Sequence, residues 1–236
     1  MTNRPDTPRS RRERPAKPAL SRAGIVATAV AVLRAEGLQK VTMRRLAQEL
    51  DTGPASLYVY VRNTAELHAA VLDELLGTVG PAPAGGSWRE RLRGVLTSYT
   101  AMLLEHPSLA RSALTARPSG PNYLDLIETL LALLDEGGVP PAQAAWGVDL
   151  LLQLATATAA EHADEASEED WDALRAALHS ASERDRPHIA ALAGHLLSGA
   201  GPEDRMAWGF EVLIAGIART AVPVSPQHPT GSEENS

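Results

Sequence analysis

The sequence predicts an all-α protein in which a short N-terminal unit precedes a larger helical body. Apolar residues recur at three- and four-residue spacing along most of the chain, the pattern of amphipathic helices. No stretch has the sustained alternation and β-branched content of a strand. Aromatic residues make up only 4% of the chain, so Ala and Leu supply most of the apolar bulk, which suits close-packed helices.

Capping residues mark the ends of the first four helices. Ser21, Thr42 and Asn63 are each placed to accept a backbone N–H of the helix that follows. Gly37 suits the position just beyond the first helix, and a tight break at residues 51–53 separates the second helix from the third. The predicted helices span residues 21–36, 42–50, 54–61 and 63–77.

Seven further helices are predicted beyond a Pro- and Gly-rich connection at residues 80–87. They span residues 88–105, 107–115, 122–136, 141–163, 167–181, 186–197 and 202–221. The N-terminal arm and the C-terminal tail lack a periodic apolar face, so we expect the first to be disordered and the second loose. The expected division is a basic arm at 1–19, an N-terminal domain at 20–66, a helical body at 67–222 and a tail at 223–236.

The net charge of −7 conceals a division between the two parts of the chain. Residues 1–64 hold twelve Lys and Arg against five Asp and Glu, whereas residues 65–236 hold ten against twenty-four. This asymmetry indicates a cationic unit that meets a polyanion, attached to an acidic body with another task. Chance clustering of surface charges is the alternative.

Cysteine usage and hydropathy indicate the compartment. The chain has no cysteine, which excludes disulfides and cysteine-based zinc sites and fits a reducing cytoplasm. No apolar run is long enough to span a membrane, and the N-terminus has no apolar stretch of signal-peptide kind. We therefore expect a cytoplasmic protein with no membrane partner. Arginine outnumbers lysine twenty to two, which indicates a GC-rich, bacterial genome.

Two short helices joined by a tight break and backed by a longer helix form a helix-turn-helix unit. The second short helix is expected to enter the major groove of double-stranded DNA. Ser56 and Tyr60 share one face of it, and a tyrosine hydroxyl can donate to a phosphate oxygen. Arg44 and Arg45 supply cations that read guanine or hold the DNA backbone. A place in the core is the alternative for Tyr58.

The stretch "TMRRLAQELDTGPASLYVYVRN", residues 42–63, resembles the DNA-binding signature of the tetracycline-repressor (TetR) family of transcriptional regulators. The resemblance covers residues 20–77 and implies that Arg44 and Ser56 lie near base edges. Asp51 stands where many members have Gly, and Asp tolerates the left-handed backbone that such a turn requires. Thr64 replaces the usual Lys, a lost charge for which Arg62 is expected to compensate. The expected DNA contacts are Thr42, Arg44, Arg45, Ser56, Tyr58, Tyr60, Arg62 and Thr64.

Two helices of the body, residues 140–163 and 202–221, are apolar around most of their circumference and carry small residues. Such helices must be buried on several sides, and small residues let them approach closely. In a two-fold homodimer they would form a four-helix bundle with their mates. A single helix-turn-helix reads one half-site weakly, which also favours a homodimer over the alternative of an ordinary monomer core.

The stretches "SWRERL", "HPSLARSALTARP" and "GFEVLIAGI" resemble the tetracycline-repressor branch of that family, in the same order. This implies a ligand-responsive homodimer with a small-molecule pocket in the body. Ala113 stands where that branch binds the magnesium of its drug through histidine, so we expect neither a metal nor a cofactor. The implied pocket is apolar, and its effector a small, largely apolar molecule. The expected pocket residues are Val95, Tyr99, Ala113, Ala116, Leu126, Leu130, Trp146 and Glu161.

The sequence gives less support to a metal site or to catalytic activity than to DNA binding. A group of acidic residues and one histidine matches no standard metal spacing and is expected to face water: His162, Asp164, Glu165, Glu168 and Glu169. No nucleophile motif or phosphate loop is present. The favoured function is a homodimeric repressor that a small effector releases from a palindromic operator. An all-α enzyme with an incidental basic N-terminus and a DNA-binding dimer without a small ligand stay open.

Overall fold

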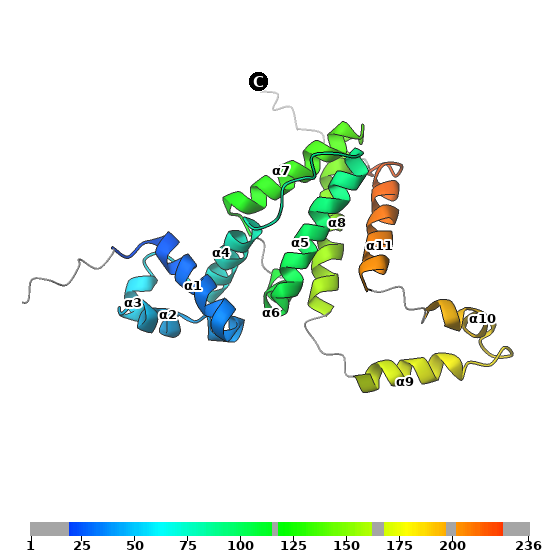
Figure 1. The fold of residues 1–236 in the computed structure, drawn as a ribbon, viewed down its shortest axis with the longest axis horizontal. Coiled ribbons are helices and arrows are strands. Elements are labelled where there is room, and N and C mark those ends of the chain that lie inside the picture. The colour runs from blue at the N-terminus through cyan, green and yellow to red at the C-terminus, as the bar shows by residue number, and fades with distance from the viewer. Residues whose placement is uncertain (1–18, 115–117, 162–167, 197–201, 224–236) are drawn as a thin grey trace, which may run out of the picture.

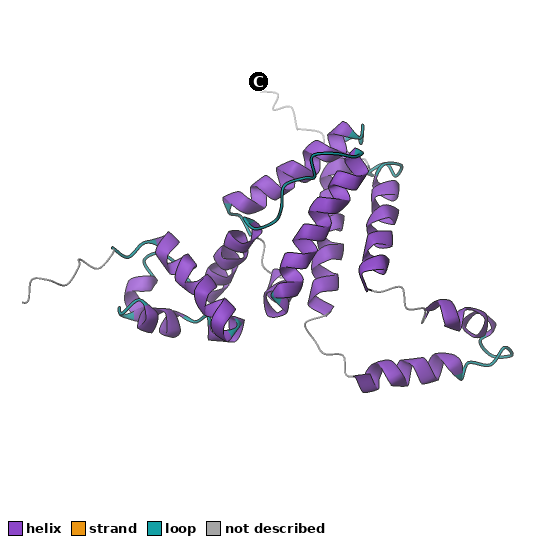
Figure 2. Ribbon diagram, viewed as in Figure 1, coloured by secondary structure: helices purple, strands orange, loops and turns teal. Residues whose placement is uncertain are grey.

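The computed structural model describes residues 19–114, 118–161, 168–196 and 202–223, which contain helices and loops but no strand (Figures 1 and 2). The elements are α1 (Arg22–Glu36), η1 (Leu38–Lys40), α2 (Met43–Glu49), α3 (Pro54–Leu57), α4 (Thr64–Leu76), α5 (Trp88–Glu105), α6 (Pro107–Ala113), α7 (Pro121–Glu136), α8 (Pro141–Glu161), α9 (Glu168–His179), α10 (Pro187–Leu196) and α11 (Pro202–Ile217). The predicted all-α fold is confirmed. The basic arm, apart from Ala19, and the tail beyond Pro223 lie outside the described residues.

The three predicted helix caps are present at the start of α1, α2 and α4. The side-chain oxygens of Ser21, Thr42 and Asn63 accept the backbone N–H three residues further on, at 3.1, 3.2 and 2.8 Å. Asp51 has φ of 47°, the left-handed conformation that its place in the turn predicts. These local signals fix the direction in which each short helix leaves its turn.

α3 is shorter than predicted and ends at Leu57 instead of residue 61. The chain leaves the helix through a turn in which the N–H groups of Tyr60 and Val61 both donate to the Leu57 carbonyl, at 2.9 and 3.0 Å. Val61 is fully buried, and Asn63 must be extended, with φ of −161°, to cap α4. The helix therefore ends early because its next residues are needed for the entry into α4.

α4 belongs to both parts of the molecule. It packs against α1 on one side and against α6 and α7 on the other, and its apolar residues Leu67, Val71 and Leu75 are buried. Since it runs unbroken from Thr64 to Leu76, it crosses the division predicted between residues 66 and 67. In Figure 1, α4 connects the N-terminal helices to the body.

α8 lies at the centre of the body and packs against α5, α6, α7 and α11. Its contact with α11 is close, because a Cβ at Gly147 would lie 2.7 Å from Cγ2 of Ile217. Gln143 of α8 also donates through Nε2 to the Ile217 carbonyl at 2.9 Å. This bond satisfies a carbonyl at the end of α11, and the helix ends four residues earlier than predicted.

α9 and α10 pack against each other and extend away from the rest of the body (Figure 1). Leu174, Leu192 and Leu196 on these two helices are exposed. Within the described ranges, none of the helices combines the length and apolar character needed to cross a membrane.

Candidate nucleic-acid interface and small-molecule pocket

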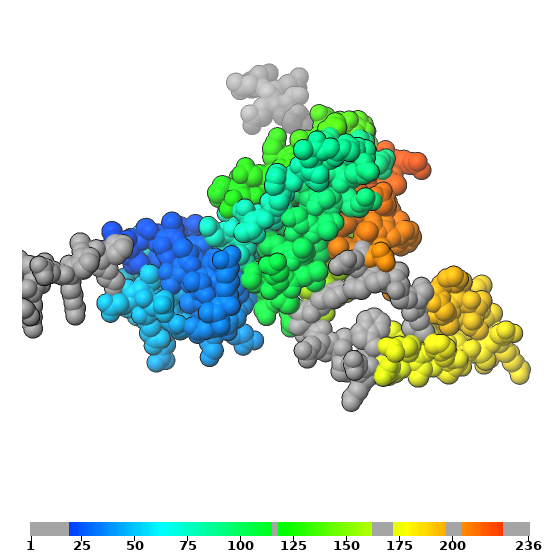
Figure 3. Space-filling model, viewed as in Figure 1, coloured from blue at the N-terminus to red at the C-terminus, as the bar shows by residue number. Residues whose placement is uncertain are grey.

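The N-terminal helices form one end of the molecule, coloured blue to cyan in Figure 3, and three consecutive residues after α3 are exposed there. Tyr58, Val59 and Tyr60 have exposed fractions of 52%, 80% and 36%. Leu57 and Val61, on either side of them, are fully buried. Tyr58, Val59 and Tyr60 therefore form an exposed tip between two buried residues, and the core alternative for Tyr58 is excluded.

The two arginines of α2 have different surroundings. Arg44 is exposed, and no carboxylate of the described residues forms an ion pair with it. Arg45 donates to Glu36 at 2.6 Å and to Glu49 at 2.7 Å, which joins α1 to α2. The hydrogen bonds to Glu36 and Glu49 raise the pKa of Arg45, and Arg45 lowers the pKa of the Glu36 carboxyl. The Arg45 guanidinium thus pairs with two carboxylates of its own chain, whereas that of Arg44 does not.

Two hydroxyls lie near the starts of the short helices. The Thr42 oxygen accepts the N–H of Arg45, which leaves its own O–H available to donate. Ser56 is exposed on α3, and its backbone N–H donates to the carbonyl of Gly53 at 3.0 Å. Both side chains can therefore serve as hydrogen-bond donors to an external acceptor.

The junction between the tip and α4 carries one more cation. Arg62 donates to Glu66 through its backbone N–H at 2.9 Å and through Nε at 3.0 Å. These two contacts lower the pKa of the Glu66 carboxyl. The Arg62 side chain is nonetheless 86% exposed, and such surface pairs are weak, so it can exchange Glu66 for another anion. Thr64, the first residue of α4, is exposed beside it.

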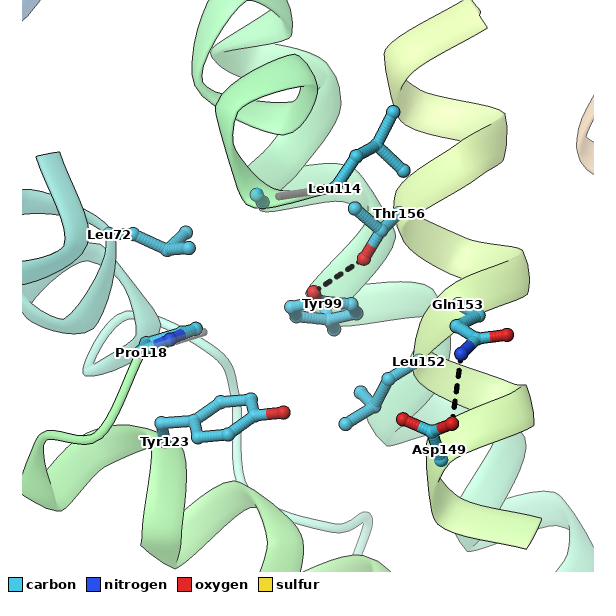
Figure 4. A pocket seen from close by; sticks show the side chains of 10 residues that line it. Leu72, Tyr99, Leu114, Pro118, Tyr123, Asp149, Leu152, Gln153 and Thr156 are labelled. Carbon is cyan, nitrogen blue, oxygen red and sulfur yellow. Dashed lines mark hydrogen bonds between the residues drawn. The ribbon is translucent and has the colours of Figure 1, made fainter. Parts of the chain in front are cut away.

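A pocket lies in the body between α4, α5, α7 and α8 (Figure 4). At its inner end the hydroxyls of Tyr99 and Thr156 form a hydrogen bond of 2.8 Å. Burial raises the pKa of Tyr99 to about 12, so the phenol stays protonated at neutral pH. The cavity measures about 110 Å³. Its lining residues are Leu72, Tyr99, Ala113, Leu114, Pro118, Tyr123, Asp149, Leu152, Gln153 and Thr156.

The residues expected at the pocket do not all lie there. Tyr99 and Ala113 line it. Val95 and Leu126 line a neighbouring cavity under the connection that follows α4. Leu130 is fully buried in the core. These five expected residues, from α5, α6 and α7, are therefore distributed among the pocket, the neighbouring cavity and the core.

The remaining three expected residues do not line the cavity as the structure describes it. Trp146 is 58% exposed, on a face of α8 that it shares with exposed Leu150. Glu161, the last residue of α8, is also exposed and does not line the pocket. Ala116 lies outside the described residues.

The pocket residues expected from the sequence did not include two polar residues of α8. Asp149 and Gln153 lie one turn apart on an otherwise apolar helix, and Gln153 donates to Asp149 at 2.8 Å. That interruption of an apolar helix is the signal that could have identified them. Tyr123, Leu72 and Pro118 carry no comparable signal, since only the approach of α4 and α7 brings them together. The pocket is therefore lined by both apolar and polar side chains, with Asp149 and Gln153 next to each other on α8 (Figure 4).

A metal centre has no support among the residues that are described, because they contain no cluster of three His, Asp or Glu side chains suited to a metal ion. Asp149 is the one carboxylate that lines the pocket. Of the acidic group weighed from the sequence, His162, Asp164 and Glu165 lie outside the described residues.

Known proteins match both parts of the chain. Residues 25–71 match the family described as bacterial regulatory proteins, tetR family, and residues 80–221 match the tetracycline repressor-like C-terminal domain. An HTH-type transcriptional regulator of Saccharopolyspora erythraea is 32% identical over 220 residues, which is 87% of either chain. The tetracycline repressor protein class D of Escherichia coli is 32% identical over 122 residues, 50% of this chain and 56% of that protein.

Solved structures from Streptomyces share the fold. The transcription regulator SCO7704 superposes with a TM-score of 0.77 at 61% identity, over 89% of this chain and all of the other. ActR of Streptomyces coelicolor in complex with actinorhodin superposes with a TM-score of 0.73 at 38% identity, over 85% of this chain and 96% of ActR. The match extends over the helix-turn-helix unit and the body alike. The chain belongs to the TetR family of bacterial, helix-turn-helix DNA-binding transcriptional regulators.

Proposed function

We propose that the protein is a homodimeric repressor that binds a palindromic operator and leaves it when a small effector enters the body pocket. The observation that carries this proposal is the arrangement of α4, one unbroken helix that packs on the DNA-binding unit and also lines the pocket. A change at the pocket can therefore reach the DNA-binding end through a single rigid element.

The exposed tip supports a division of roles on DNA. The hydroxyls of Tyr58 and Tyr60 are carried on rigid rings of the exposed tip, so they can donate to phosphates with little loss of side-chain entropy. Arg44 is an exposed cation, and a guanidinium recognises guanine through two parallel hydrogen bonds. Thr42 and Ser56 add short donors beside it. Arg62 would contribute a further phosphate contact by exchanging Glu66 for DNA.

The pocket favours a small molecule that carries both an apolar part and polar groups. Leu72, Pro118 and Leu152 would contact the apolar part, while Asp149 and Gln153 would bind hydroxyl or amino groups. Solved ActR structures contain actinorhodin or (S)-DNPA, and we extend that class of effector to this chain by similarity. The cavity of about 110 Å³ is smaller than typical ligand pockets of about 300–1,000 Å³, so an effector must widen it. Widening is what a ligand needs in order to favour a second arrangement of the helices.

Exposed apolar side chains on α8 and α11 support the proposed homodimer. Trp146 and Leu150 on α8, and Trp208 and Val212 on α11, are all exposed. Four large apolar side chains on two adjacent helices are typical of an interface. Two-fold pairing through this surface would present two helix-turn-helix units to a palindromic site.

The test is a selection of operators from random double-stranded DNA at moderate salt, repeated with actinorhodin and with (S)-DNPA. We expect an inverted-repeat sequence to be enriched and either compound to reduce its retention. Failure to enrich any sequence would overturn the proposal as a whole. A second outcome is that an operator is enriched but neither compound reduces its retention, and that the pocket stays closed in crystals grown with the compounds. This outcome would favour a DNA-binding dimer without a small ligand. The small size of the cavity is the observation that keeps this second function in view.

A further inference from the structure

Asp73 is a buried carboxylate that belongs to neither the DNA-binding tip nor the pocket. Its residue is 8% exposed, in the middle of the contact between α4 and the start of α7. Carboxylates are rarely buried unless specific donors satisfy them. Here the donor is the backbone N–H of Tyr123, at 2.9 Å from Oδ1.

The N-terminus of α7 depends on this carboxylate for its cap. The residue at the N-cap of α7 is Gly120, which has no side chain to accept the free N–H groups of the first turn. Asp73 supplies that acceptor from another helix, and its negative charge lies at the positive end of the α7 dipole. Asn122 completes the contact by donating through Nδ2 to the Asp73 carbonyl at 2.9 Å.

Close packing makes this joint rigid. An ideal Cβ at Gly120 would lie 2.1 Å from Cγ and Oδ2 of Asp73, so no other residue fits there while the carboxylate keeps its place. A Cβ at Gly77 would come within 3.2 Å of Oδ1 of Asn122. We call the contact formed by Asp73, Gly120, Asn122 and Tyr123 the α4–α7 joint.

The joint lies between the pocket and an open cavity. Tyr123 places its ring in the pocket, and Leu72, the neighbour of Asp73, lines the pocket as well (Figure 4). On the other side, a cavity of about 500 Å³ separates the joint from Arg22 and Arg62 of the DNA-binding unit. Tyr123 thus contacts the pocket through its ring and Asp73 through its backbone N–H, and the cavity on the other side leaves space into which α4 can move.

We propose that Asp73 couples the pocket to the DNA-binding end by tying α4 to the first turn of α7. This inference rests on the proposed function, since it assigns the residue through which the two sites communicate. Leu72 and Tyr123 sense the pocket, Asp73 carries the displacement to α4, and Glu66 passes it to Arg62 next to the DNA-binding tip. Asp73 is a positioning residue and touches neither DNA nor effector.

Hydrogen exchange tests the coupling without an identified effector, because coupling between sites is reciprocal. The probe is the double-stranded operator recovered by the selection. In the wild-type protein, we expect the operator to slow exchange at the Tyr123 amide and its neighbours in α7 by about fivefold or more. In Asp73→Ala the operator should still bind, but the change in α7 should disappear. Asp73→Asn should restore part of it, since an amide oxygen can also accept the Tyr123 N–H.

Glu74→Ala is the matched control, because it removes the same charge from the next, exposed position of α4. It should leave the operator-induced change in α7 intact. Two results would overturn the assignment. One is that the operator leaves the exchange rates of α7 amides unchanged in the wild type, and the other is that it slows them as much in Asp73→Ala as in the wild type. If no operator is recovered at all, the proposed function fails first, which is a separate result. Thermal melts of each variant separate loss of coupling from loss of folding.

Discussion

At the scale of single residues, burial separates the side chains that hold the helix-turn-helix unit together from those that face outward. Leu57 and Val61 are fully buried, while the three residues between them are exposed. Arg44 and Arg45 are divided in the same way, although they are adjacent and chemically identical. Arg44 is exposed, whereas Arg45 binds two carboxylates of its own chain.

Arg44→Ala and Tyr60→Phe should weaken DNA binding in different ways. Loss of a guanidinium that reads a base costs about 1–3 kcal/mol and relaxes the preference at one base pair. Loss of a phenol that contacts phosphate should weaken binding to all sequences alike. Competition binding against a set of single-base operator variants distinguishes these results. Equal losses at every operator position in Arg44→Ala would contradict the base-reading role.

Arg45→Ala should destabilise the N-terminal unit and leave the order of operator preferences unchanged. The substitution removes the ion pairs that join α1 to α2, so the melting temperature should fall, more at low salt than at high salt. The measurement is a thermal melt at two ionic strengths, with Arg44→Ala as the matched control. A changed sequence preference in Arg45→Ala would contradict this assignment.

Tyr99→Phe should make the protein more resistant to alkali than the wild type. The pKa of Tyr99 is raised from its usual 10 to about 12, so above pH 10 the unfolded state releases a proton that the folded state retains. Wild-type stability should therefore fall by about 1 kcal/mol per pH unit between pH 10 and 12 through this group. At pH 8 the wild type should be the more stable protein, because Tyr99→Phe leaves the Thr156 hydroxyl without its partner, at a cost of about 1–2 kcal/mol that the alkaline effect offsets only as the pH approaches 12. Urea unfolding at pH 8 and pH 11 should show the stability difference between the two proteins shrink by about 1 kcal/mol.

At the scale of secondary-structure elements, the sequence predicted helix starts well and contacts between helices poorly. The caps at Ser21, Thr42 and Asn63 are local, since each oxygen binds an N–H three residues away. Near the early ends of α3 and α11, Val61 is buried and Gln143 binds the Ile217 carbonyl, and both contacts exist only in the folded chain.

The sequence indicated the part of the chain that contains the pocket, but not the full set of residues that line it. Resemblance drew attention to Tyr99 and Ala113, which do line the cavity. Leu72 and Tyr123 come from α4 and α7, which are brought together by tertiary packing, so no spacing along the chain predicts that they meet. Asp73 is the clearest case, because one acidic residue in an amphipathic helix resembles any surface charge until its partner is known.

Gly147→Ala should disturb the contact between α8 and α11. The added methyl group would lie 2.7 Å from Cγ2 of Ile217, and overpacking of this kind typically costs about 1–3 kcal/mol. Ile217→Ala makes room, so the cost of Gly147→Ala should be smaller in that background than in the wild type. Urea unfolding of the four proteins gives the coupling energy. Additive losses would show that the two residues do not share this contact in solution.

At the scale of the whole molecule, α8 and α11, which carry the exposed apolar surface, are separated from α1, α2 and α3 by α4 and α5 (Figure 1). The proposed dimer uses this apolar surface to position two copies of the DNA-binding surface. α4 and the body helices lie between the two surfaces, so any change in the pocket occurs along the path that connects them.

Trp208→Glu should convert the protein to monomers. A charge placed at this 71% exposed position on α11 would be buried unpaired in the proposed four-helix bundle. Leu124→Glu is the matched control, since Leu124 is also exposed but lies on α7. Sedimentation velocity should give a monomer for the first and a dimer for the second, with unchanged circular dichroism. A dimeric Trp208→Glu protein with full operator affinity would contradict the proposed interface.

The exposed tip has a consequence for how such regulators diversify. Val59 is 80% exposed between two buried anchors, so substitutions there should alter stability by less than about 0.5 kcal/mol. Selection can therefore vary this position freely while the fold and the pocket are inherited unchanged. Arg44 and Ser56, the residues expected near base edges, are exposed as well. After a gene duplication, two copies could therefore acquire different target sites by exchanging exposed residues alone and still answer to the same signal.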